Sequence, residues 1–134
     1  MGLGEAMIVA GVGCRKGVAE TEIAAAIAAA LARAGLTASV LSLVATSATK
    51  GEEHGITAAA AALGVPLVLV PQEDLEAAGS RTATKSDRVA ALTGVPSLAE
   101  AAALAAGGAS ARLIAPRVAV GPATCALAQT GDPP

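Results

Sequence analysis

The sequence contains no phenylalanine, tryptophan or tyrosine, although 54% of its 134 residues are hydrophobic. A core must therefore be built from alanine, valine, leucine and isoleucine, and we expect alanine-rich helices to lie close to a sheet. Single-strand nucleic-acid modules stack bases on aromatic side chains, and this chain offers none. Its net charge of −2 also gives no general basic surface for DNA or RNA. We therefore expect no nucleic-acid partner.

Cysteine and histidine are also scarce, with two cysteines and one histidine in the chain. No spacing among them is typical of a zinc site, and we expect no metal and no cofactor. Glu5 stands where a signal peptide would have a basic residue. We therefore expect a cytoplasmic protein in which Cys14 and Cys125, far apart in the sequence, are free thiols.

One long uncharged stretch, Ile56–Pro71, is the nearest approach to a membrane span. Gly64-Val65-Pro66 interrupts it, and a proline both ends a helix and favours an extended segment. We therefore expect a buried helix followed by a buried strand, and no membrane-spanning segment.

What the chain does contain is a regular alternation of apolar segments and turn residues. Apolar runs and helical spacing predict strands at Ala6–Val12, Val40–Val44 and Leu67–Val70, and helices at Glu20–Ala34 and Gly55–Leu63. A short helix and then a mobile loop are expected over Gln72–Lys85, and one or two helical turns over Asp87–Leu92. Ser97 and Glu100 form a capping box before an alanine-rich helix that ends at Gly107-Gly108. One or two strands follow, over Arg112–Ala115 and Val118–Ala128.

This alternation predicts an α/β fold with three layers, in which helices cover both faces of a mainly parallel or mixed sheet of about five strands. The last two strands follow each other closely, so they can form an antiparallel pair. Neither a repeat nor a linker is evident. We expect a single domain over residues 1–134, with a flexible tail at residues 130–134.

Glycine and basic residues follow the first predicted strand, in the loop Gly11–Gly17. The loop is not a Walker A motif, because Val18 follows its last glycine, and the glycine spacing departs from the dinucleotide fingerprint. Small residues still allow a ligand to approach the backbone, and a helix begins just beyond. Arg15 can also bind a carboxylate through two hydrogen bonds.

Six of the nine basic residues fall in the predicted connections, namely Arg15, Lys16, Lys50, Arg81, Lys85 and Arg117. Ligands of parallel sheets bind outside the carboxyl ends of the strands, so this placement favours an anion-binding rim. The alternative is that charged residues simply prefer loops. His54 is expected to flank a helix; as a general base it would need an orienting partner that the sequence does not identify. Thr124 is a candidate ligand donor or a strand-end residue.

In their order along the chain, these motifs resemble the CobE/CbiG family of cobalamin biosynthesis. The resemblance covers residues from about Met7 to Ala128 and is carried by Gly11–Gly17, Glu22-Ile23, Ala26-Ile27, Ala45-Thr46 with Lys50 and Glu53, Leu63–Leu67, Thr84 and Ser86 before Val89, Thr93–Leu104, Pro116-Arg117 and Ala123–Ala128. The stretch Thr93–Leu104 is the most specific of them. Lys85 stands where the family pattern has proline.

The resemblance implies a role in making the corrin ring. CbiG-like members open the lactone of a cobalt-precorrin and release acetaldehyde, and they carry a further N-terminal region. This chain has no such region and is therefore expected to be the stand-alone form, which binds a precorrin-type tetrapyrrole. The candidate ligand-binding residues are Gly11, Gly13, Cys14, Arg15, Gly17, Thr46, Lys50, Arg117 and Thr124.

Three alternatives stay open beside precorrin binding. One is lactone hydrolysis itself, with water activated by a carboxylate such as Glu53. Another is an interaction module that docks on a methyltransferase or other enzyme of the cobalamin pathway through an apolar surface. The last is phosphate or nucleotide binding by the glycine-rich loop, for which we expect no thermal shift with ATP or phosphate.

Overall fold

A mixed five-stranded sheet lies at the centre of the computed structural model, which describes residues 7–50, 53–82 and 97–130. Its strands are β1 (Ile8–Cys14), β2 (Leu41–Ser47), β3 (Leu67–Val70), β4 (Arg112–Val120) and β5 (Ala123–Gln129), in the order β3-β2-β1-β5-β4. The first three strands are parallel, and β5 runs antiparallel to both of its neighbours. The predicted mixed sheet and its antiparallel C-terminal pair are confirmed.

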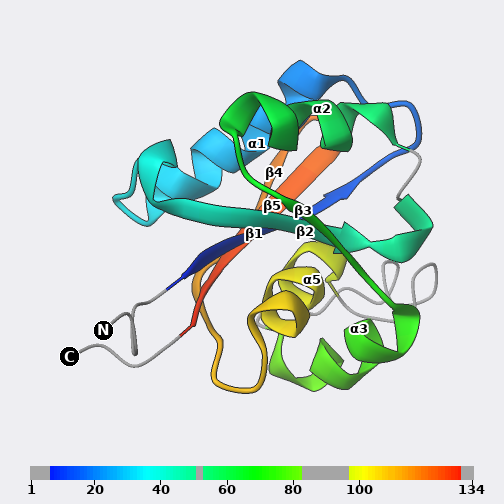
Figure 1. Ribbon diagram of the computed structural model, residues 1–134, viewed down its shortest axis with the longest axis vertical. Helices are drawn as coiled ribbons and strands as arrows, with labels where there is room; N and C mark the ends of the chain where they lie inside the picture. The colour runs from blue at the N-terminus through cyan, green and yellow to red at the C-terminus, as the bar shows by residue number, and fades with distance from the viewer. Residues whose placement is uncertain (1–6, 51–52, 83–96, 131–134) are drawn as a thin grey trace.

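Helices cover both faces of the sheet, as the three-layer prediction requires. Figure 1 shows α1 (Glu20–Arg33) and α2 (His54–Leu63) on one face, and α3 (Gln72–Ala78) and α5 (Leu98–Gly107) on the other. Short 3₁₀ turns η1 (Ala38–Val40), η2 (Ala48–Lys50) and η3 (Gly79–Arg81) complete the described elements. Within the described part of the chain, no helix has the length and apolar character needed to cross a membrane.

The core is divided by the sheet into two apolar clusters. Successive side chains of a strand point to opposite faces, so Val12 packs with Ile23 and Ile27 of α1, while Val9 packs with α5. The α5 cluster consists largely of alanines, and its leucines are Leu75, Leu98 and Leu104. Because these side chains are short, the α5 backbone lies close to the sheet.

Gly11 shows how close this approach is. A Cβ atom at this position would lie 2.0 Å from the carbonyl oxygen of Ala99 and 2.6 Å from the amide nitrogen of Ala103. Both atoms belong to the α5 backbone, so glycine is required for the helix to pack on β1. The close packing expected from an alanine-rich composition is thus present where α5 contacts Gly11 of β1.

Several strand boundaries differ from the sequence prediction. β1 continues to Cys14 and β2 to Ser47, because polar side chains support these strand ends: the Thr46 hydroxyl donates to the carbonyl oxygen of Val12 at 2.7 Å. β4 also runs through Pro116, which an edge strand tolerates at a position where its pairing register shifts. The break between the last two strands therefore lies at residues 121–122.

The C-terminal end of β5 is tied to the start of β1. The amide of Thr130 donates to the carbonyl oxygen of Met7 at 3.0 Å, and the amide of Met7 donates to the Thr130 hydroxyl at 3.2 Å. The predicted flexible tail therefore begins no earlier than residue 131. The turns expected over Asp87–Leu92 and the rest of the tail lie outside the described residues.

Candidate functional site

The connections that follow β1 and β2 lie side by side at one edge of the sheet. These strands are parallel neighbours, with Gly11 opposite Ala45, so their carboxyl ends meet at the same edge (Figure 1). One connection runs over residues 15–19 to α1. The other contains η2 and leads to Glu53, whose amide donates to the carbonyl oxygen of Lys50 at 3.0 Å. This edge is where ligands of parallel sheets bind.

Two contacts join these connections to each other. The amide of Gly17 donates to Oε1 of Glu53 at 2.9 Å. Next to it, Gly55 lies against the loop so closely that a Cβ atom there would be 2.4 Å from the carbonyl oxygen of Val18. Gly17 has a left-handed backbone with φ of 78°, a conformation that glycine adopts without the steric cost of a side chain. The first turn of α2 is therefore docked on the loop that precedes α1.

The pKa of Cys14, at the end of β1, is affected by the charged residues of this junction. Burial raises the pKa of the Cys14 thiol, the positive charge of Lys50 lowers this pKa, and the negative charge of Glu53 raises it. Both charged groups therefore lie near enough to act on the thiol. The other cysteine, Cys125, is a fully buried free thiol in the core, and burial raises its pKa further.

We expect Cys14 to react with a small disulfide reagent at about pH 8 more slowly than a free thiol, because its raised pKa leaves less thiolate. Glu53→Gln should increase the rate a few-fold, since a neighbouring negative charge is lost, and Lys50→Met should decrease it. Rates measured between about pH 7 and pH 10 separate a change in pKa from a change in access. The buried Cys125 serves as the internal unreactive thiol. Equal rate profiles in both variants would contradict this assignment of charges.

The loop after β1 presents its basic side chains to solvent. Arg15 and Lys16 are exposed and Lys50 is half-buried. The amide of Arg15 donates to the carbonyl oxygen of Pro122 at 3.1 Å, which ties the loop to the β4–β5 turn. Among the described residues, no ion pair engages the side chains of these three residues. That Arg15 faces a ligand stays a prediction. Its exposed side chain is free to contact one.

Arg117 lies within β4 and not in a connection, which corrects its predicted place in the rim. It is two strands from β1, about 10 Å to the side, and the pairing of Val118 with Cys125 and of Cys125 with Val12 places it level with the middle of β1. Its amide donates to Oε2 of Glu100 at 2.9 Å, and Glu100 is fully buried in the first turn of α5. The predicted cap is present in that Ser97 Oγ accepts from the Glu100 amide at 3.4 Å. The carboxylate contact to β4 was not foreseen, because a capping motif is a local pattern whereas this contact spans 17 positions.

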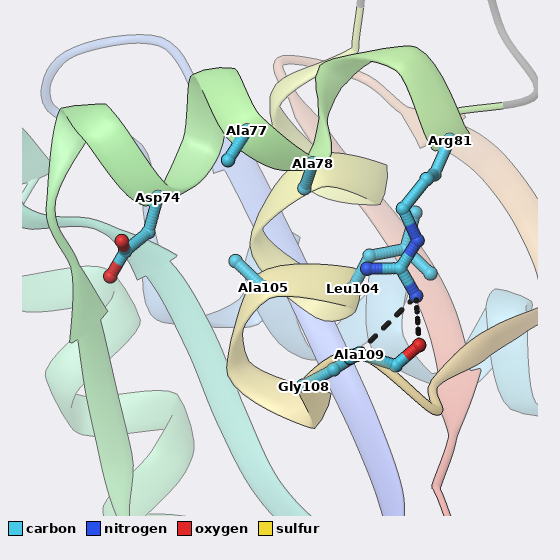
Figure 2. A pocket seen from close by; sticks show the side chains of 8 residues that line it. All are labelled: Asp74, Ala77, Ala78, Arg81, Leu104, Ala105, Gly108 and Ala109. Atoms are coloured by element: carbon cyan, nitrogen blue, oxygen red, sulfur yellow. Dashed lines mark hydrogen bonds between the residues drawn. The ribbon is translucent and has the colours of Figure 1, made fainter.

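Arg81 is placed away from this edge, which corrects its assignment to the basic rim. Figure 2 shows its side chain reaching the C-terminal end of α5, where Nη2 donates to the carbonyl oxygens of Gly108, Ala109 and Ala111. The neighbouring Gly107 lies near Thr130 and Val9, at the opposite end of β1 from Cys14. A cation is favourable at a helix C-terminus, so Arg81 caps α5. Lys85 lies outside the described residues.

Four candidate ligand residues are built into the sheet. Gly11 contacts α5, as described above, and Gly13 is buried beside Thr124. The hydroxyl of Thr124 donates to the carbonyl oxygen of Gly13 at 3.1 Å. Thr46 has none of its surface exposed. Gly11 and Thr46 are buried, and Gly13 and Thr124 are hydrogen-bonded to each other within the sheet, so we leave all four out of the site proposed below.

The candidate site therefore consists of Cys14, Arg15, Gly17, Lys50 and Glu53, which the structure brings together. His54 is the exposed first residue of α2. In the residues that the structure describes, no group of three histidine, cysteine, aspartate or glutamate side chains is placed to hold a metal ion. What the edge offers chemically is a cluster of cationic side chains with one carboxylate on a loop amide, an arrangement suited to an anionic ligand.

Residues 8–128 match the family model described as cobalamin synthesis G C-terminus, so the chain belongs to this family of cobalamin biosynthesis proteins. It is 40% identical over 121 residues to Protein CobE of a Sinorhizobium species, covering 90% of this chain and 79% of that protein. The family resemblance inferred from the ordered motifs is thereby confirmed.

Solved structures agree with this placement. The crystal structure of CobE, described as a protein from the cobalamin (vitamin B12) biosynthetic pathway, is similar with a TM-score of 0.87, 29% identity and coverage of 93% of this chain and 91% of that one. The cobalamin biosynthesis protein chiG of Agrobacterium tumefaciens is 45% identical with a TM-score of 0.74, covering 94% of this chain and all of that one. A cobalamin biosynthesis protein G homolog of Sulfolobus solfataricus has a TM-score of 0.68 and 26% identity, but the match covers only 36% of that longer chain.

Proposed function

We propose that this cobalamin biosynthesis protein binds a precorrin-type tetrapyrrole at the edge formed by the connections after β1 and β2. The observation that carries the proposal is the grouping of Arg15, Lys16 and Lys50 there without ion pairs among the described residues. Precorrins carry acetate and propionate groups around a large ring. Each hydrogen bond between such a carboxylate and a charged donor contributes about 1.5–3 kcal/mol.

A large ring suits candidate residues that are spread over several strands. Arg117 lies about two strand spacings from β1. A ligand with carboxylates on several sides of its ring can extend from the edge towards it. Since the chain has no aromatic residue, the ring face would rest on glycine and aliphatic side chains.

Glu53 lies at the junction of the two connections. One of its carboxylate oxygens, Oε1, accepts from the amide of Gly17 at 2.9 Å. This contact gives the residue a structural role that requires no catalytic one. Lactone hydrolysis with Glu53 as the base that activates water is a separate hypothesis, which an acetaldehyde assay with the lactone intermediate would test. Docking on a pathway methyltransferase is a separate hypothesis that co-purification of the two proteins would test.

The proposal is tested by titrating the protein into uroporphyrin, a stable tetrapyrrole with eight carboxylates, and following the visible absorption band of the porphyrin. We expect a saturable spectral shift that weakens as salt is added, because exposed charges are screened. Protoporphyrin, with two carboxylates, should bind at least about tenfold more weakly, since it lacks charge-assisted contacts. Absence of a shift, or equal affinity for the two porphyrins, would contradict the proposal.

A further inference from the structure

We infer that the amide of Gly17 is a carboxylate-binding subsite that Glu53 occupies in the free protein, and that a ligand carboxylate replaces Glu53 there on binding. The inference rests on the proposed function for the identity of the ligand. It assigns to Glu53 the role of an internal competitor, which sets the affinity of the site, rather than that of a base.

The geometry shows that this amide already binds a carboxylate. The Gly17 amide nitrogen and Oε1 of Glu53 are 2.9 Å apart, the distance of a normal charge-assisted hydrogen bond. Gly17 is exposed, and a Cβ atom built on it would have no other atom within 4 Å. The loop is therefore open on the Cα side of Gly17, and the group that occupies its amide is the Glu53 carboxylate.

The charges favour exchange over the addition of a second carboxylate. Glu53 and Lys50 both act on the Cys14 thiol, so the negative charge of Glu53 lies in the same region as Lys50. The exposed cationic side chains of Arg15 and Lys16 belong to the adjoining loop. An incoming carboxylate is attracted by the cations and repelled by Glu53 at the same position. Moving the Glu53 side chain into solvent removes this repulsion and frees the Gly17 amide in one step.

The Glu53 side chain can leave without unfolding the helix that it precedes. Glu53 is the N-cap residue of α2, but its side chain makes no capping hydrogen bond. The amides of Ile56 and Thr57 donate instead to its backbone carbonyl oxygen, at 3.1 and 3.4 Å. The contact of Gly55 with Val18 also holds α2 against the loop without the help of this carboxylate. Release of the side chain is therefore a local change.

The test compares Glu53→Ala with Glu22→Gln in the uroporphyrin titration. Glu22 is the matched control because its Oε1 accepts from the amide of Ala19, at 3.2 Å, in the same loop. Both substitutions remove one negative charge, but only the first frees the Gly17 amide. We expect Glu53→Ala to bind uroporphyrin about tenfold more tightly than the wild type, as the loss of one competing charge-assisted hydrogen bond implies. Glu22→Gln should change the affinity by less than about twofold, because exposed charges outside the binding site contribute little.

Unchanged or weakened binding by Glu53→Ala, in a variant whose circular dichroism matches the wild type, would overturn the inference. A second measurement separates it from the proposed function. Acetate is titrated while the amide resonance of Gly17 is followed by nuclear magnetic resonance. We expect this resonance to shift in Glu53→Ala and not in the wild type. If the wild type binds no uroporphyrin, the proposed function fails; if acetate shifts the Gly17 resonance in neither protein, the subsite fails.

Discussion

Gly11→Ala should destabilise the protein strongly. The added methyl group would lie 2.0 Å from the carbonyl oxygen of Ala99 and 2.6 Å from the amide nitrogen of Ala103. These are backbone atoms inside α5, so no side-chain rotation relieves the overlap, and the whole helix must move away from β1. We expect a loss of at least about 3 kcal/mol from a total stability that for a domain of this size is about 5–15 kcal/mol.

Thermal unfolding followed by far-ultraviolet circular dichroism measures this effect, since the chain has no tryptophan or tyrosine to give a fluorescence signal. Gly13→Ala is the matched control on the same strand. Its added methyl group would meet the Thr124 hydroxyl at 2.8 Å, and a side chain can rotate away, so we expect a loss of about 1 kcal/mol. This corresponds to a melting temperature lower by about 3–5 °C, against about 10 °C or more for Gly11→Ala. Equal melting temperatures of the two variants would contradict the proposed packing.

The double variant Arg15→Ala/Lys50→Ala should lose uroporphyrin affinity by about 100-fold or more. Each side chain is placed at the edge where β1 and β2 end, and each is expected to contribute one charge-assisted contact of about 1.5–3 kcal/mol. Because each 1.4 kcal/mol is a factor of ten in affinity, two such contacts account for the expected loss. The titration of the porphyrin absorption band measures it directly.

The control for this variant is Arg33→Ala/Arg112→Ala, which removes the same net charge elsewhere. Both arginines are exposed, Arg33 in the last turn of α1 and Arg112 at the start of β4, opposite Gln129. We expect the control to weaken binding by less than about threefold, since distant exposed charges are screened by salt. If the two double variants lose affinity equally, the ligand responds to net charge and the site is placed wrongly.

Family membership and chemical role are supported by different observations. The family follows from motifs distributed over residues 8–128 and from the similarity to CobE. The proposed role rests on the charges at one edge of the sheet, and here Glu53 matters most. The sequence offers Glu53 as a carboxylate for the activation of water in lactone hydrolysis. Its hydrogen bond to Gly17 is the basis of our proposal that it competes with a ligand carboxylate instead.

Much of the fold was determined by local sequence patterns. The helix predicted at Glu20–Ala34 is present as α1, and the strand at Leu67–Val70 is present with the same bounds. In these segments the apolar spacing and the flanking glycine or proline act within a few residues of each other. The absence of aromatic residues likewise determined that the helices would pack closely on the sheet.

Contacts between distant segments decided the rest. The glycine-rich stretch read as one loop is divided in the structure, because hydrogen bonds from Thr46 and Thr124 keep Val12 and Gly13 within the sheet. Arg81 likewise caps α5 instead of lying in the basic rim, because its hydrogen-bond partners lie about 30 positions further along the chain. A local sequence pattern does not contain this contact.

The sequence by itself thus determined the order of strands and helices, the family and the charged character of the site. Only the tertiary structure decided which glycine is packed against a helix and which has its amide on a carboxylate. Gly11 and Gly17 are the same residue type in one short stretch. One is pressed against the backbone of α5, and the other presents its amide to a carboxylate 36 positions away. The steric and electrostatic surroundings that distinguish them come from segments that meet only in the folded chain.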